Sequence, residues 1–252
     1  MPRTLATLAA ATAAGVVATA LIGSPGAAAA ADTSAPVVKR VNVRPETVGL
    51  YKGRTSRITV VARITDDVGV TEAFVGLVSD RDEDATQEFE LERVSGTPQD
   101  GLWGVTVFSD NATTTGLWAG LVVGVDAAGN ESALDDTSPY DEFMVKRNTM
   151  IRDFNVREPA TKGSFLRMTG RLVRLEPGRG YVGYRNKTMH VLFKAAGTRT
   201  WVKVGEVRTS ATGSFANTRR FRARKDGTWL VVFDGTSNYL AETSHRDYVD
   251  VR

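Results

Sequence analysis

The sequence contains no cysteine and only two histidines, His190 and His245. Without thiols there is neither a disulfide nor a thiol nucleophile, so each domain must be held by its apolar core alone. A Gly-x-Ser-x-Gly nucleophile elbow, a His-Glu-x-x-His zinc motif and a phosphate-binding loop are also missing. These absences predict a protein that is not an enzyme and has no cofactor.

The amino-terminal 31 residues have the pattern of a secretory signal. Arg3 is followed by an alanine-rich apolar run from Leu5 to Ile22, a break at 24–26 and the small residues 27–31. We therefore expect a secreted protein that begins near Asp32 and has no membrane span in its mature chain. The alternative interpretation is a membrane anchor, because the apolar run approaches the length of a span.

The remaining chain shows the short alternating runs and glycine-rich turns of β-strands. Residues 57–65 place Ile58 and Val60 on one face, and 116–125 is apolar on both faces, which predicts a central strand. The run 215–223 is expected to be a strand of the second half. No helical period of useful length follows the signal. The sequence predicts an all-β chain of two antiparallel sandwiches, one in 32–147 and one in 148–252.

Short motifs give this prediction a family resemblance. Residues 37–146 resemble the bacterial immunoglobulin-like modules of secreted actinobacterial proteins. The motifs are Ser95-Gly96-Thr97 leading to Trp103, Gly116-x-Trp118, and Asp126 to Asn130. Such modules serve as spacers, adhesins and accessory parts of extracellular enzymes, so the resemblance implies the fold more than the function.

Residues 150–252 resemble a second immunoglobulin-like or carboxypeptidase-regulatory-like module. The matching features are Gly170-Arg171-Leu172, Trp201-x-x-Val204-Gly205, Thr212-Gly213-x-Phe215 and Gly227-x-Trp229. The resemblance implies two tandem modules that cover nearly the whole mature chain.

Charge divides the chain into unlike halves. Residues 32–146 contain 10 basic and 20 acidic side chains, a net charge of −10, whereas 147–252 contain 21 and 9, a net charge of +12. The densest basic segment is 219–225, and its candidate polyanion-binding residues are Arg219, Arg220, Arg222, Arg224 and Lys225. A strand would align alternate guanidinium groups for phosphates or carboxylates.

Three interpretations of the basic segment stay open. It is a solvated strand edge, a contact with an anionic cell-wall polymer, or a surface that docks on the acidic half or on another envelope protein. A nucleic-acid partner is excluded by the expected location outside the cell. The oligomeric state is not determined by the sequence.

The candidate metal ligands are the carboxylates of the acidic loop, Asp80, Asp82 and Asp84, with Asp66, Asp67 and Asp126 in other loops. Carboxylates are the ligands that Ca²⁺ prefers. A calcium loop of the EF-hand type is excluded, because its sixth and twelfth positions would be Ala85 and Leu91. A calcium site assembled from several loops stays open, as does a merely solvated hairpin.

Aromatic residues add a further alternative. Trp103, Trp118 and Trp229 fall at positions expected in the cores, whereas Trp201, Tyr181, Tyr184 and Tyr239 lie nearer to turns, where they can stack on sugars. The main hypothesis is a secreted, non-catalytic binding or adhesion protein of the cell envelope or matrix. The second is a calcium-stiffened spacer or self-associating module. The third is a carbohydrate-binding or carbohydrate-active protein, since glycoside hydrolysis needs only two carboxylates.

Overall fold

The computed structural model describes residues 32–217 and 221–252, so the signal predicted for 1–31 lies outside the described residues. The described chain is built from β-strands with one 3₁₀ turn, η1 (Glu83–Ala85), and contains no α-helix. The all-β prediction is therefore confirmed. No helix within these ranges has the length and apolar character needed to cross a membrane.

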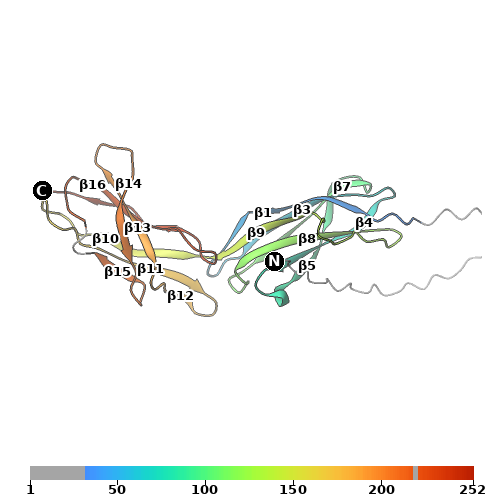
Figure 1. Cartoon of the computed structure of the whole chain (residues 1–252), viewed down its shortest axis with the longest axis horizontal. Coiled ribbons are helices and arrows are strands. Elements are labelled where there is room, and N and C mark those ends of the chain that lie inside the picture. The colour runs from blue at the N-terminus through green and yellow to red at the C-terminus, as the bar shows by residue number, and fades with distance from the viewer. Residues whose placement is uncertain (1–31, 218–220) are drawn as a thin grey trace, which may run out of the picture. The chain divides into compact units, whose positions relative to one another are not determined.

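Residues 37–147 form two sheets (Figure 1). Their strands are β1 (Val37–Arg44), β2 (Thr47–Leu50), β3 (Ser56–Thr65), β4 (Val70–Ser79), β5 (Gln87–Glu90), β6 (Glu92–Gly96), β7 (Asp100–Ser109), β8 (Gly116–Asp126) and β9 (Tyr140–Arg147). One sheet has the order β1-β3-β7-β6 and the other β2-β9-β8-β4-β5. The expected central strand is β8, which lies between β9 and β4, and buried residues alternate along its whole length.

Two features of these sheets differ from the prediction. The sandwich is not purely antiparallel, because β2 runs parallel to β9, with Val48 opposite Val145. The strand expected at 88–92 is two strands in different sheets, β5 and β6, separated by the buried Leu91. The chain passes from one sheet to the other at this residue, so its side chain enters the core.

Residues 149–249 form two further sheets. Their strands are β10 (Thr149–Val156), β11 (Met168–Glu176), β12 (Gly180–Gly183), β13 (Thr188–Ala195), β14 (Val202–Arg208), β15 (Ser214–Asn217), β16 (Gly227–Phe233), β17 (Glu242–Thr243) and β18 (Asp247–Val249). In the first sheet β11 pairs with β10, β12 and β15, and in the second β16 pairs with β13, β17 and β18. Both sheets supply the buried core, which includes Leu172, Met189 and Val231.

The expected strand at 215–223 is shorter than predicted. Strand β15 ends at Asn217, and beyond the undescribed residues 218–220 only Arg222 forms an isolated bridge, with Phe165. Phe221 and Ala223 are nevertheless buried. Core contacts, together with backbone hydrogen bonds between residues 163–166 and Phe221 and Ala223, hold this segment in place.

One pair of sheets ends at residue 147 and the next begins at residue 149. The two compact units into which the chain divides have different bounds. One compact unit contains 61–105 and 120–140, and the other contains 43–60, 106–119 and 141–252. The domain limits 32–147 and 148–252 therefore stay a prediction. We call residues 32–147 the acidic half of the chain and residues 148–252 the basic half.

Candidate functional site

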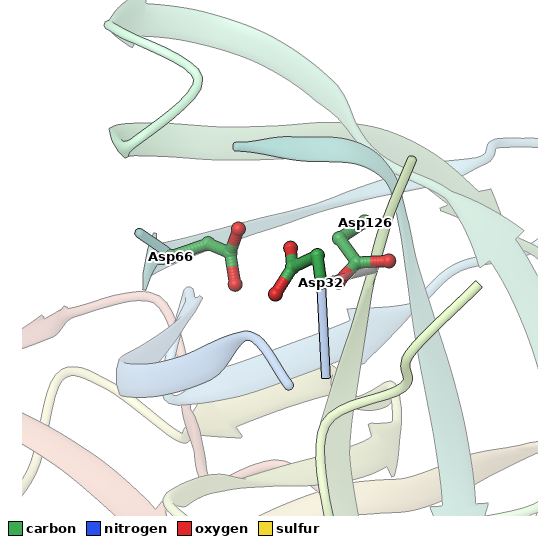
Figure 2. A group of neighbouring side chains, drawn as sticks. All are labelled: Asp32, Asp66 and Asp126. Carbon is green, nitrogen blue, oxygen red and sulfur yellow. The ribbon is translucent and has the colours of Figure 1, made fainter. Parts of the chain in front are cut away.

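Three carboxylates from separate parts of the acidic half lie together. Asp32 precedes β1, Asp66 follows the end of β3, and Asp126 is the last residue of β8. One carboxylate oxygen of each lies within 4.8 Å of the other two. Figure 2 shows the three carboxyl groups side by side, with Asp32 between the others. We call these three residues the acidic cluster.

Asp126 is fixed by the turn that follows β8. Its side chain is buried, and its Oδ1 accepts hydrogen bonds from the backbone amides of Ala128 (2.8 Å) and Asn130 (2.9 Å). Burial raises the pKa of this carboxyl, but hydrogen bonds from Asn130, Ala128 and Gly129 outweigh burial and lower the pKa below its usual value. Asp126 is therefore charged at neutral pH.

The other two carboxylates are only half satisfied. Asp66 Oδ2 accepts from the backbone amides of Val68 (3.1 Å) and Gly69 (2.6 Å), and Asp32 Oδ1 accepts from that of Ser34 (3.0 Å). Asp66 Oδ1 and Asp32 Oδ2 are buried and accept no hydrogen bond from a described residue. Buried oxygens of like charge without donors are costly, whereas a hard cation such as Ca²⁺ is held by such oxygens. The chemistry of the donor set thus fits a divalent cation.

The structure does not bring the predicted metal ligands into this cluster. Asp80, Asp82 and Asp84 lie in the exposed turn after β4, where Asp80 Oδ1 is 4.0 Å from Arg81 Nε. Of the loop residues considered with them, Asp66 and Asp126 do belong to the cluster. Asp32 is not among the predicted ligands because it stands in a polar leader with no sequence signal, and only the fold brings it to the other two.

The basic segment 219–225 is described only in part. Arg219 and Arg220 lie outside the described residues, and Arg224 and Lys225 are exposed. Arg222 Nη1 donates to the carbonyl of Gly163 (2.6 Å), and its guanidinium carbon is 4.0 Å from the centroid of the Phe165 ring. Arg222 is therefore used within the basic half, and the alignment of alternate guanidinium groups stays a prediction, because Arg220 lies outside the described residues.

A recess of about 520 Å³ opens elsewhere on the basic half. It is formed by the end of β11, the turn between β12 and β13, and the loop after β16. Its lining residues are Arg174, Tyr184, Arg185, Asn186, Lys187, Thr236, Ser237, Asn238 and Tyr239. Two of the four aromatic residues considered for stacking meet here, with the ring centroids of Tyr184 and Tyr239 4.9 Å apart.

The other two aromatic residues are engaged elsewhere. Trp201 lies 5.1 Å from Lys194 Nζ and 5.9 Å from the guanidinium carbon of Arg246, measured to its ring centroid. Tyr181 lies 5.1 Å from the guanidinium carbon of Arg152, measured in the same way. The structure thus joins Tyr184 to Tyr239, and neither Trp201 nor Tyr181 lines their recess.

No family model matches the chain, and no curated protein matches it. It is similar to solved structures, among them a GspB Siglec domain (17% identity, TM-score 0.29), which matches 53% of this chain. The chain spans 65% of that structure. Fibronectin(III)-like modules of Clostridium thermocellum CbhA have 14% identity and a TM-score of 0.34, over 84% of this chain and 92% of theirs. Red sea bream transglutaminase has 9% identity and a TM-score of 0.36, over 83% of this chain and 31% of its own. At such low TM-scores these similarities carry no argument about function.

His190 has partners that the sequence does not reveal. Its Nε2 is 2.7 Å from Asp234 Oδ2, and its Nδ1 is 3.3 Å from Glu206 Oε1. Lys203 also binds Glu206 at 2.9 Å, and this contact, with the smaller effect of His190, lowers the pKa of Glu206. The sheet pairing explains the meeting, because β13 lies between β14 and β16. Lys203 and Glu206 thus form an ion pair on the sheet surface, and His190 lies between Glu206 and Asp234.

Proposed function

We propose that this protein is a non-catalytic binding module that acts outside the cell, at the envelope or in the matrix. Its basic half holds an anionic polymer, and its acidic half is repelled by that polymer. The observation that supports this proposal best is the division of charge, with a net charge of −10 in residues 32–146 and +12 in 147–252. A field of one sign over one half attracts a polymer of the opposite sign and fixes which half it meets.

Among the described residues of the basic half, ion pairs leave most of the positive charge unpaired. Several of its few carboxylates are already bound, with Glu176 holding Arg174 and Arg179, and Asp250 holding Arg252. Residues 148–252 contain 20 basic residues against 9 acidic ones, so positive charge is in surplus. Guanidinium groups, which form most of this surplus, bind phosphate and carboxylate in a planar, two-point manner.

Sedimentation with anionic and neutral polymers tests this proposal. We expect the chain to pellet with teichoic acid or polyuronate, but not with cellulose, at about 50 mM NaCl, and to be released at about 500 mM, because salt screens exposed charges. Replacing Arg219, Arg220, Arg224 and Lys225 with Gln is expected to weaken pelleting. Arg222 is left intact because of its contacts with Gly163 and Phe165.

The matched control removes four exposed cations from the acidic half, Lys39, Arg40, Lys52 and Arg54. Both variants change the net charge by the same amount. If both variants weaken pelleting equally, or if pelleting does not depend on the salt concentration, a contact made by the basic half is contradicted.

The second candidate is a calcium-stiffened spacer, and the acidic cluster favours it. Asp32 precedes β1, whereas Asp66 and Asp126 follow β3 and β8, so one ion at this point would tie three segments of the acidic half together. Ligands that bind only the folded state raise its stability. A calcium-dependent rise in melting temperature tests this candidate.

A further inference from the structure

The recess on the basic half is open to solvent, and its lining combines groups that can bind an anion and its hydroxyl groups. Its volume of about 520 Å³ falls within the range of small-molecule sites. It combines three cationic side chains (Arg174, Arg185, Lys187), two tyrosine rings, and the hydroxyl and amide groups of Asn186 and residues 236–238. Cations, ring faces and neutral hydrogen-bonding groups thus converge on one space.

The charge in the recess is not neutralised by the protein. Arg174 is paired with Glu176, its Nε donating to Glu176 Oε1 at 3.0 Å. Arg185 and Lys187 have no ion pair with any carboxylate in the described ranges, and Lys187 Nζ instead lies 4.6 Å from the centroid of the Tyr184 ring. Among the described carboxylates only Glu176 pairs with one of the three cations, so an excess of two positive charges lines the recess.

The walls of the recess are held in place before any ligand binds. Thr209 is buried, and its hydroxyl accepts from the backbone amide of Lys187 (2.8 Å) and donates to the carbonyl of Tyr184 (2.7 Å). In the loop after β16, Thr236 Oγ1 accepts from the backbone amides of Asn238 and Tyr239, each at 3.2 Å. A rigid site loses less entropy on binding than a mobile one.

The aromatic floor is fixed by its cations. The guanidinium carbon of Arg174 lies 4.8 Å from the ring centroid of Tyr184 and 5.4 Å from that of Tyr239. Burial raises the pKa of Tyr239, so its hydroxyl stays protonated at neutral pH and can donate a hydrogen bond. Because Tyr184 is buried, the floor offers the hydroxyl and the partly exposed ring of Tyr239.

We propose that this recess binds one anionic, hydroxyl-rich unit, a sugar or polyol that bears a phosphate or a carboxylate. The oxyanion is held by Arg185 and Lys187, while Asn186, Ser237 and Asn238 contact its hydroxyl groups. This inference deepens the proposed function and rests on it, because the unit is one repeat of the anionic polymer. The whole basic half then attracts the polymer over a long range, and the recess selects the repeating unit that it binds.

Titration of the full chain with small probes tests the recess. The anionic probes are glycerol 3-phosphate and glucuronate, the neutral probes are glycerol and glucose, and binding is followed by NMR shifts of residues 184–187 and 236–239. We expect the anionic probes to bind and the neutral ones to bind at least about tenfold more weakly, because they lack the charge-assisted contacts. Comparing the two anionic probes distinguishes a phosphate polymer from a uronate polymer.

The variant Arg185→Ala/Lys187→Ala removes the two cations that have no carboxylate partner, and the matched control is Arg199→Ala/Arg208→Ala. Both control residues are exposed and outside the recess, so the net charge changes equally. The recess variant is expected to lose about tenfold or more in probe affinity, and the control less than about twofold. Thermal unfolding of both variants shows that the fold is kept.

The two proposals fail in different ways. Suppose that the chain pellets with the polymer but both double variants weaken pelleting equally, or that no small probe binds. The recess assignment is then overturned while the proposed function stands. If no anionic polymer pellets at low salt, the proposed function is overturned whatever the small probes do. Equal binding of charged and neutral probes would also overturn the assignment, because the cations would then contribute nothing.

Discussion

Asn130 donates two hydrogen bonds to Asp126, from its backbone amide to Oδ1 at 2.9 Å and from its side-chain amide to Oδ2 at 2.7 Å. The same side-chain amide also lies 3.2 Å from the carbonyl oxygen of Asp32. Gly129 has a φ of +86°, which closes the turn between Asp126 and Asn130. The turn at the end of β8 is thereby linked to the segment that precedes β1.

The acidic half is expected to lose stability in acid through Asp126. Its folded-state pKa is lowered, so its contribution is complete above the unfolded pKa of about 3.9 and is lost as the pH falls through the folded value. Urea midpoints at neutral pH and below about pH 4 measure this loss. Asp126→Asn should reduce the acid sensitivity without abolishing it, because the pKa values of Asp100 and Asp135 are also lowered. An unchanged pH profile in this variant would contradict the assignment.

Alternation of apolar residues was sufficient to predict most strands, because one face of each strand is buried. It predicted β3 and β8 nearly to the residue, and the buried positions of Trp118 and Trp229 are as expected. It missed β2, whose four residues are too few to show a period. The parallel pairing of β2 with β9 depends on tertiary contacts that no local pattern records.

Both candidate sites depend on contacts between residues far apart in the sequence. Tyr184 and Tyr239 are brought together by the turn after β12 and the loop after β16. Asp32 and Asp126 meet because the segment that precedes β1 lies beside the end of β8. Composition predicted acidic loops and a basic half, but only the fold decides which charges become neighbours.

Glycine at position 183 is expected to be essential for the basic half. A Cβ there would overlap the main-chain carbonyl of Thr212, which cannot move like a side chain. Gly183→Ala should cost about 2–4 kcal/mol of unfolding free energy, as overpacking against backbone does. The control is Gly178→Asn, because Gly178 has open space and a φ of +68° that asparagine tolerates. Equal urea midpoints for the two variants would contradict the prediction.

The two buried tryptophans at Gly-x-Trp motifs should respond differently to loss of the indole nitrogen. Trp118 Nε1 donates to the carbonyl of Thr114 at 3.0 Å, whereas Trp229 Nε1 is buried and has no partner in the described chain. Trp118→Phe removes this hydrogen bond, but Trp229→Phe removes an N–H group that has no partner in the described chain. We expect Trp118→Phe to cost about 1–3 kcal/mol more in chemical unfolding. A larger loss at Trp229 would show that ring packing decides the difference.

Calcium is expected to raise the melting temperature of the full chain through the acidic cluster. Asp66→Asn removes one charge from the cluster, so it should leave the calcium-free melting temperature unchanged or higher, because repulsion between Asp32, Asp66 and Asp126 is reduced. It should also abolish most of the calcium-induced rise, which at about 100-fold excess over Kd corresponds to about 2.7 kcal/mol. Differential scanning calorimetry with calcium or with a chelator measures both effects.

Asp67→Asn is the matched control, since Asp67 is the adjacent residue, is exposed and is not part of the cluster. The same loss of charge at this position should preserve the calcium response. The measurement is made on chains that begin at Asp32 and on chains with residues before it, because an α-ammonium group at Asp32 would itself place a positive charge beside the carboxylates. A calcium response only in the extended chain would mean that this ammonium replaces the ion. No response in either chain, or an equal response in Asp66→Asn, would contradict a calcium site at the cluster.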